Sequence, residues 1–254
     1  MAPRQRIDRL LVERGLFESR AKAQAAIAAG RVTANEVTVA KPSDEVSTDA
    51  VLRAEPAHPW VSRGGVKLAA ALDHFRFDPI FDPSGCVCLD VGASTGGFTQ
   101  VLLAGGARRV YAVDVGRGQL HPSLRGRPEI ISLEATDIRT LGGAELAERP
   151  NVITIDVSFI SLKLVLPAAL ALAGPPASLL ALIKPQFEVG RGDTKRGGMK
   201  KGIVRDPLVQ DAVCKDVAAF VASLGWTVVD VIPSPIAGGD GNREFFIGAR
   251  RREI

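Results

Sequence analysis

The chain of 254 residues is 46% apolar and 24% charged, a composition that excludes an intrinsically disordered protein. It is long enough for one large domain, or for a small and a medium one. Its three cysteines, Cys86, Cys88 and Cys214, and its three histidines form no disulfide framework or metal-ligand pattern, so we expect reduced thiols, no metal and a cytoplasmic protein. The net charge of +4 permits an acidic partner such as nucleic acid without requiring one.

The first 57 residues predict a small α+β domain. Apolar residues share one face of a predicted helix over residues 6–15, and Ser19 can cap a second helix over residues 20–30. Residues 31–40 predict two strands joined by a tight turn. The first half of this domain holds seven Lys/Arg residues against three acids, which predicts a basic face on the helices. From charge alone, an ordinary solvated helical surface is the alternative.

Residues 54–60 hold two prolines and predict a stiff linker, placed over residues 58–61, before a second domain, residues 62–254. Apolar strands alternate there with helical stretches, and two strands close in sequence end the chain. This pattern predicts a Rossmann-like, doubly wound α/β domain with seven strands, the last of them antiparallel. The expected elements are a helix over 63–76; strands near 86–91, 109–114, 130–134, 151–156 and 178–184; a long helix from Asp206-Pro207 to about Leu224; and strands within 226–232 and 243–250.

One apolar stretch has the length of a membrane span. Residues 164–183 are 20 long and uncharged, but Pro167 and the Gly174-Pro175-Pro176 break divide them. A helix followed by a buried strand explains the stretch better, so we expect no membrane span. The first eleven residues also lack the apolar core of a signal peptide.

A glycine-rich turn follows the first strand of the second domain, and its glycines let the backbone approach a ligand closely. Asp114 closes the next strand, where a carboxylate can hold both hydroxyls of a ribose. Asp137 follows the third strand, where it could meet an adenine amino group. This set suits an adenosine without phosphates that carries a small amino-acid tail, and it predicts S-adenosylmethionine; a plain nucleotide-binding fold is the alternative. The candidate cofactor-binding residues are Ser62, Arg63, Gly64, Asp90, Gly92, Ser94, Gly96, Gly97, Phe98, Asp114, Val115, Asp137, Ile138 and Asp156.

Four charged residues are expected at the carboxyl edge of the sheet, where ligands bind in open α/β folds. Asp156 ends the fourth strand, Lys184 ends the fifth, Glu244 begins the reversed last strand, and Lys67 lies on the first helix. A lysine whose pKa is lowered by partial burial and a neighbouring cation can act as a base. We therefore predict that Lys184 takes the proton of a ribose 2′-hydroxyl, with Lys67 as that cation and Asp156 orienting Lys184. Glu244 would bind either the hydroxyl or Lys67; a purely structural lysine–carboxylate network is the alternative.

Two other methyl acceptors fit the sequence less well. Sites that methylate exocyclic amines usually carry Asn/Asp-Pro-Pro-aromatic after the fourth strand, where this chain reads DVSF. Methylation of a cytosine carbon needs a cysteine nucleophile, whereas Cys214 falls in a predicted helix and the other two cysteines fall in the first strand. A ribose oxygen is therefore the favoured acceptor.

Five motifs together carry a family resemblance: SRGGVKL, DVGASTGGFT, DVSFISL, IKPQFE and GNREFF. The chain resembles, over essentially its whole length, the TlyA family of bacterial ribosomal-RNA 2′-O-methyltransferases, and its second domain is similar to the FtsJ-type ribose methyltransferases. Lys67, Asp156, Lys184 and Glu244 match the Lys-Asp-Lys-Glu tetrad of that type in order and local context. The resemblance implies an S-adenosylmethionine-dependent enzyme that acts on a cytidine ribose in 16S rRNA, 23S rRNA or both.

Residues 6–52 resemble a small RNA-binding module first described in a ribosomal protein of the small subunit. The family usually has Asn-Gly at the turn where this chain has Asn35-Glu36, which leaves the turn type open. The resemblance implies that the basic face binds ribosomal RNA. We also interpret the loop over residues 185–204 as a phosphate-contacting lid, an idle solvated loop being the alternative. The candidate RNA-binding residues are Arg4, Arg6, Arg20, Lys22, Arg31, Arg191, Lys195, Arg196, Lys200 and Lys201.

Two functions of other classes stay open. An RNA-binding ribosome-assembly factor with a vestigial methyltransferase fold would need neither the tetrad nor the glycine turn, and both are present. Members of the family have also been called haemolysins, but the sequence offers neither a membrane span nor a basic amphipathic membrane helix. The nucleotide modified and the oligomeric state are not encoded in these patterns.

Overall fold

The computed structural model describes residues 2–189, 199–200 and 202–252. The chain divides into two compact units, Met1–Pro59 and Trp60–Ile254. The predicted linker over residues 58–61 stays a prediction.

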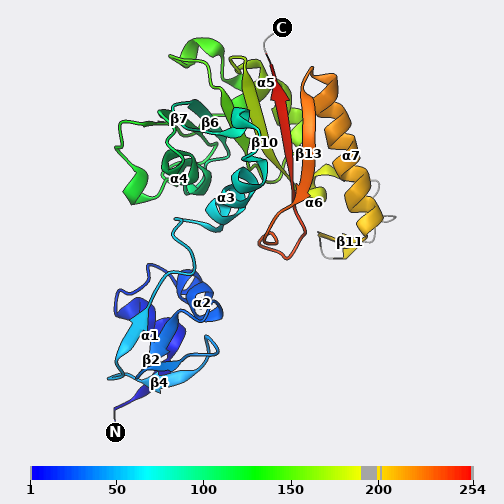
Figure 1. The fold of residues 1–254 in the computed structure, drawn as a ribbon. Helices are drawn as coiled ribbons and strands as arrows, with labels where there is room; N and C mark the ends of the chain where they lie inside the picture. Colours follow the sequence, from blue (N-terminus) through cyan, green and yellow to red (C-terminus); the bar gives the residue numbers. More distant parts are fainter. Residues whose placement is uncertain (1, 190–198, 201, 253–254) are drawn as a thin grey trace. The chain divides into compact units, whose positions relative to one another are not determined.

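The first unit contains two short helices and two small sheets (Figure 1). Ser19 caps α2 as expected, because its side chain accepts a hydrogen bond from the Lys22 amide. Strands β2, β3 and β5 form one antiparallel sheet, and β1 pairs with β4. The elements are β1 Arg4–Arg6, α1 Ile7–Glu13, α2 Arg20–Ala28, β2 Val32–Ala34, β3 Val37–Thr38, β4 Glu45–Ser47 and β5 Leu52–Ala54. Their core consists of Ile7, Leu11, Phe17, Ala23, Ala26, Ile27, Val32 and Val39.

The turn between β2 and β3 uses two residues in the left-handed region, Asn35 with φ 50° and Glu36 with φ 68°. Asparagine tolerates this conformation, and the Asn35 side chain also accepts a hydrogen bond from the Val51 amide at 2.9 Å. Glu36 gains little in compensation, since the ion pair that it makes among the described residues is an exposed 3.8 Å contact with Arg53. The chain thus keeps a tight hairpin turn without the usual glycine, at a cost in backbone strain.

We expect Glu36→Gly to stabilise the first unit by about 0.5–1 kcal/mol, because relief of left-handed strain outweighs the added flexibility of the unfolded chain. Hydrogen exchange of the β2 and β5 amides in the full chain measures this stability. Asn35→Gly is the matched control: it removes the side-chain bond to Val51 and should not stabilise. Faster exchange in Glu36→Gly would refute the strain argument.

The second unit is built on one seven-stranded sheet with the order β13-β14-β10-β9-β6-β7-β8. Strand β14 runs antiparallel to both its neighbours, and the remaining pairs are parallel. The predicted seven-stranded fold with its reversed last strand is therefore confirmed. Its strands are β6 Val87–Val91, β7 Arg109–Val113, β8 Ile130–Leu133, β9 Val152–Ile155, β10 Ala177–Ile183, β13 Thr227–Pro233 and β14 Phe245–Arg251; its helices are α3 Arg63–Phe75, α4 Gly97–Ala104, α5 Leu162–Ala171, α6 Pro185–Glu188 and α7 Pro207–Ser223.

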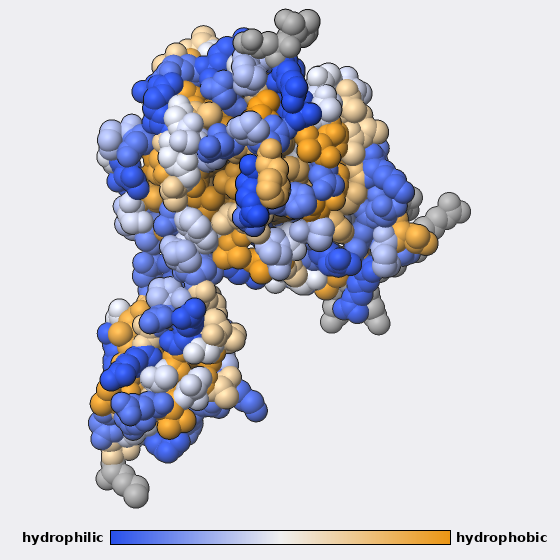
Figure 2. Space-filling model, viewed as in Figure 1, coloured by the Kyte–Doolittle hydropathy of each residue, from blue (hydrophilic) through white to orange (hydrophobic). Residues whose placement is uncertain are grey.

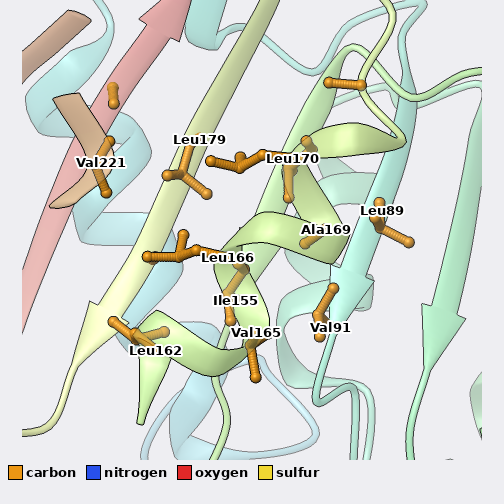
Figure 3. Close-up of a cluster of buried hydrophobic side chains, with 14 of the residues drawn as sticks. Leu89, Val91, Ile155, Leu162, Val165, Leu166, Ala169, Leu170, Leu179 and Val221 are labelled. Atoms are coloured by element: carbon orange, nitrogen blue, oxygen red, sulfur yellow. The ribbon is translucent and has the colours of Figure 1, made fainter. Parts of the chain in front are cut away.

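Both faces of this sheet are covered. On one face, Leu89, Ile155 and Leu179 pack with side chains of α5 and α7 (Figure 3). On the other face, Cys88 and Leu180 pack with residues of α3 and α4. Successive residues of a strand point to opposite faces, so a strand covered on both sides is apolar throughout, which is the pattern seen in the sequence.

Two expectations about the connections are wrong. No α-helix lies between β7 and β8 or between β8 and β9, where the structure has only short 3₁₀ turns at Pro122–Leu124, Ile138–Thr140 and Gly143–Glu145. The β7–β8 connection holds three glycines and two prolines, which disfavour a longer helix. The segment over residues 185–204 is also not one continuous loop, because it contains α6 and a small hairpin, β11 Met199–Lys200 and β12 Ile203–Val204.

The apolar stretch over residues 164–183 consists of most of α5 and the buried strand β10, as predicted. Among the described residues, no helix is long and apolar enough to cross a membrane. On the face drawn in Figure 2, hydrophobic residues are interspersed with hydrophilic ones.

Candidate active site

The carboxyl ends of β6, β9 and β10 meet at one edge of the sheet because these strands are parallel. Strand β14 begins at the same edge, since Phe245 pairs with Ile183 at the end of β10. The segments that follow β6, β9 and β10, and the one that precedes β14, are therefore brought together. They carry the predicted glycine turn, Asp156, Lys184 and Glu244 respectively.

The glycine turn between β6 and α4 packs tightly against two neighbouring segments. Gly92 has φ +83°, and a Cβ atom there would lie 2.4 Å from the backbone oxygen of Asp156. A Cβ atom on Gly97 would lie 2.1 Å from the Ser62 hydroxyl oxygen. Side chains at these positions would displace Asp156 and the start of α3, so glycine is needed here for close approach as well as for conformation.

We expect Gly92→Ala to raise the Kd for S-adenosylhomocysteine on the order of 10- to 100-fold and to lower methyl transfer, because the new methyl group pushes Asp156 and its strand end outward. Calorimetric titration measures the binding. Gly85→Ala is the control, since Gly85 has φ +69° with nothing within 4 Å of the added Cβ atom. If both variants lost affinity equally, backbone strain rather than close approach would be the cause.

The turn borders a cavity of about 350 Å³, a volume in the range of sites for small ligands. Two other depressions have volumes of about 290 and 300 Å³, but neither is lined by the glycine turn or by a tetrad residue. The lining, not the size, therefore identifies the candidate site. Its lining residues are Ser62, Arg63, Gly64, Lys67, Gly92, Ala93, Ser94, Thr95, Gly97, Phe98 and Asp156.

Asp114 is held beside the glycine turn by two backbone amides. Its carboxylate accepts hydrogen bonds from the amides of Ser94 at 2.8 Å and Gly116 at 2.7 Å. Its neighbour Val115 is 72% exposed. The half-buried Asp114 carboxylate is thus held next to Ser94, a residue of the cavity wall. A group that binds the ribose hydroxyls of a ligand in the cavity would need such a position.

Three further predicted cofactor residues lie outside the lining of this cavity. The Asp137 carboxylate binds the backbone and guanidinium of Arg139, which keeps its pKa below the usual range, and Ile138 is buried in the core. Asp90 is fully buried within β6 and accepts hydrogen bonds from the hydroxyls of Thr99 at 2.6 Å and Thr154 at 3.2 Å.

Burial raises the pKa of Asp90 to about 7, although both threonine hydroxyls oppose that shift. The Asp90 side chain joins α4 to β9 through these bonds, so the structure gives it a scaffolding position rather than a place in the cavity. The sequence places an aspartate at the end of the first strand but does not show toward which face it points. Thr99 was missed, although its position in the first turn of the following helix was visible.

The four tetrad residues form two separate ion pairs. Lys184 Nζ lies 2.7 Å from Asp156 Oδ1, with the two side chains 10% and 19% exposed. Lys67 Nζ lies 2.5 Å from Glu244 Oε2, with both side chains buried. Asp156 and Lys67 both line the cavity, so each ion pair contributes one residue to its wall.

The role of Lys67 as a cation beside Lys184 stays a prediction. Lys67 is paired with Glu244, which was one of the two alternatives for that glutamate, and Lys184 is paired with Asp156 as predicted. A buried lysine needs a counter-charge of its own, and each carboxylate supplies one. The sequence assigned Asp156 to Lys184 and left the partner of Glu244 open.

Two residues near Lys184 were missed by the sequence reasoning. The Ser158 hydroxyl accepts a hydrogen bond from Lys184 Nζ at 2.9 Å. Phe159 is 91% exposed and has φ +67°, a rare conformation for a bulky residue, and its ring centroid lies 5.2 Å from that of Phe187. An aromatic residue in the DVSF motif was visible, but its exposure and its strain were not.

The candidate RNA-binding residues of the first unit make ion pairs of their own. Arg6 and Arg20 both bind Asp8, whose side chain is fully buried and whose pKa these bonds hold far below its usual range. Lys22 pairs with Glu18, four residues before it and just ahead of the N-cap residue of α2.

The other candidates divide between described and undescribed parts of the chain. Arg31 pairs with Glu55, and Arg4 donates to the backbone oxygen of Glu45. Lys200 lies in β11. The remaining four, Arg191, Lys195, Arg196 and Lys201, lie outside the described residues. In the part of the chain that is described, no group of three or more His, Cys, Asp or Glu side chains could hold a metal ion.

Family models match both units of the chain. The model for FtsJ-like methyltransferases matches residues 60–251, and the model for the S4 domain matches residues 5–52. The first match covers most of the second unit, including all four tetrad positions.

Individual relatives align with most of the chain. A protein of Mycobacterium tuberculosis named 16S/23S rRNA (cytidine-2′-O)-methyltransferase TlyA is 43% identical over 98% of this chain and 91% of its own length. A protein of Campylobacter jejuni named 23S rRNA (cytidine-2′-O)-methyltransferase TlyA is 39% identical over 81% of this chain and 76% of its own. The solved structure of a protein described as a hemolysin from Streptococcus thermophilus aligns with a TM-score of 0.74 at 37% identity and covers 100% of this chain and 90% of that one. The chain therefore belongs to the FtsJ-like methyltransferases and, within them, to the TlyA family.

Proposed function

We propose that this protein transfers a methyl group from S-adenosylmethionine to the 2′-oxygen of a cytidine ribose in ribosomal RNA. The observation that carries the proposal is the Lys184–Asp156 pair, placed where strand ends meet beside the glycine turn. The relatives from M. tuberculosis and C. jejuni are named for this activity, the first on 16S and 23S rRNA and the second on 23S rRNA. The S4 domain at residues 5–52 supports an RNA substrate.

The residues around the cavity fit the cofactor. The close-packed glycines leave backbone rather than side chains at the wall, which suits a bound amino-acid tail. Asp114 would hold the ribose hydroxyls of the cofactor, and the segment of Ser62, Arg63 and Gly64 would border its methionine end. When bound, S-adenosylmethionine would supply an electrophilic methyl group.

An ammonium group cannot accept a proton, so the step requires Lys184 as the neutral amine, with its own proton lost to solvent beforehand. That amine would hold the 2′-hydroxyl of the acceptor nucleotide and take its proton. Asp156, 2.7 Å away, would then stabilise the ammonium group that results. General-base assistance of this kind is worth roughly 10²–10⁴-fold, and correct placement of the acceptor supplies much of the remaining acceleration.

The second ion pair and the exposed aromatic ring would shape the site around this step. The Lys67–Glu244 pair joins α3 to the start of β14 and so holds one wall of the cavity in place. The Phe159 ring, exposed three residues after Asp156, offers a surface on which a nucleobase can stack.

The proposal is tested by labelled-methyl transfer to ribosomal subunits and to protein-free ribosomal RNA that lack the modification. Alkaline hydrolysis then maps the product, because a backbone linkage next to a 2′-O-methyl group resists cleavage. We expect one or a few resistant positions, each at a cytidine. Label on a base would refute ribose methylation, and binding to subunits without transfer would favour a non-catalytic assembly factor.

A further inference from the structure

Two chain segments run side by side beyond the carboxyl edge of the sheet. One follows β9 and the other follows β10, and these strands are parallel neighbours. Three residues of the second segment contact the first segment, in order along the chain. Lys184 contacts Asp156 and Ser158, the Phe187 ring lies 5.2 Å from the Phe159 ring, and Glu188 contacts the start of α5.

Glu188 makes the outermost of these contacts with both its carboxylate oxygens. Oε1 accepts a hydrogen bond from the Leu162 amide at 2.8 Å, and Oε2 accepts one from the Ser161 hydroxyl at 2.5 Å. Ser161 is the N-cap residue of α5, and its hydroxyl accepts a hydrogen bond from the Lys163 amide at 3.2 Å. Glu188 satisfies the Leu162 amide, a second unpaired donor at the start of α5, and so adds a cap from the other segment. Figure 3 shows Leu162 at the first turn of α5, near the arrowhead of the strand that carries Leu179.

The residues between Ser158, which contacts Lys184, and Ser161, which contacts Glu188, need support. Phe159 is exposed and has a left-handed backbone, so burial does not hold it in place. The residues on either side of it are held instead, Ser158 by Lys184 and Ser161 by Glu188. Removing the outer contact would free one end of the segment that carries both the partner of Lys184 and the exposed ring.

We propose that Glu188 is a positioning residue for methyl transfer: by capping α5 it holds the segment of Asp156, Ser158 and Phe159 against Lys184. This inference rests on the proposed function, because it assigns Glu188 a role in that reaction. Glu188 does not line the cavity, and it holds the end of the segment that lies farthest from Asp156. The Asp156 backbone is held independently, because its amide donates to the Val91 oxygen at 2.9 Å. Loss of Glu188 should therefore affect placement of the acceptor more than cofactor affinity.

Three variants test the inference. Glu188→Ala removes both hydrogen bonds, whereas Glu188→Gln keeps an acceptor for the Leu162 amide and an amide that can donate to Ser161. Asp206→Ala is the matched control for stability, because Asp206 caps α7 by accepting from the Leu208 amide at 2.9 Å. Each variant is assayed for kcat, KM for RNA, Kd for S-adenosylhomocysteine and hydrogen exchange at Leu162.

We expect Glu188→Ala to lower kcat on the order of 10- to 100-fold, with cofactor Kd within about twofold and faster exchange at Leu162. Glu188→Gln should restore both kcat and slow exchange, and Asp206→Ala should leave both unchanged. A Glu188→Ala protein with faster exchange at Leu162 but normal kcat would overturn the positioning role. A Glu188→Ala protein with unchanged exchange would overturn the capping contact itself. If the wild-type protein transferred no methyl group to RNA, the proposed function would fail, and the exchange data would still decide whether Glu188 holds the segment.

Discussion

Lys184→Ala should reduce methyl transfer to ribosomal RNA by roughly 10²–10⁴-fold or more, while binding of RNA and of cofactor is retained. The reason is local: the amine is removed from the position where the 2′-hydroxyl must be held and deprotonated, and the glycine turn is untouched. Single-turnover transfer of a labelled methyl group measures the chemical step, and separate titrations measure both affinities.

Lys184→Arg separates a catalytic base from a structural ion pair. Arginine can keep a contact with Asp156, so the strand ends stay paired, but it cannot act as a base in a protein. We therefore expect Lys184→Arg to be as inactive as Lys184→Ala and to unfold at nearly the wild-type temperature. An active Lys184→Arg enzyme would show that the pair serves structure alone. Lys215→Ala, which removes an exposed lysine paired with Asp211, is the control for charge.

Replacing Arg6, Arg20 and Lys22 together with alanine should weaken RNA binding on the order of 10- to 100-fold, by a similar factor for target and non-target RNA. The slope of log Kd against log salt should also fall, by up to about 0.7–0.9 for each RNA phosphate that no longer has a cationic partner on the protein. Filter binding at several salt concentrations measures both quantities.

The triple alanine variant needs a control for its effect on Asp8. Its buried carboxylate binds both arginines and also accepts a hydrogen bond from the Gln24 side chain, so the triple alanine variant leaves a buried charge short of partners. Replacing Arg6 and Arg20 with lysine keeps the charges and supplies partners for Asp8. That variant should retain most of the affinity and the salt slope. If it bound as weakly as the triple alanine variant, folding of the unit rather than phosphate attraction would explain the weaker binding.

The sheet of the second unit was predictable because its strands are buried on both faces. Such strands read as uninterrupted apolar runs, and the polar residue that ends a run marks the edge of the sheet, as Lys184 does after β10. Parallel neighbours then bring those ends together without further information. This is why the sequence could place Asp156 and Lys184 at one edge of the sheet.

The details that the sequence did not predict depend on side-chain direction and on tertiary contacts. Asp90 lies in β6, where the residues before and after it are also buried. Only the structure shows that its carboxylate accepts hydrogen bonds from the hydroxyls of Thr99 and Thr154. The sequence left two possible partners for Glu244, and only the structure shows the pairing with Lys67, 177 positions away. The left-handed backbone of Phe159 is set by the contacts around it and not by its own preference.

The most direct test of the central claim uses the acceptor oxygen itself. Once the modified cytidine is mapped, target RNA is prepared with a single 2′-deoxycytidine at that position, and a second RNA carries the same change at a neighbouring nucleotide. If Lys184 activates the ribose 2′-oxygen, the first RNA should bind normally and accept no label, while the second accepts label at the normal rate. Incorporation of label into the first RNA at the mapped position would mean that the methyl group goes to another atom, and the mechanism built on Lys184 and Asp156 would be contradicted.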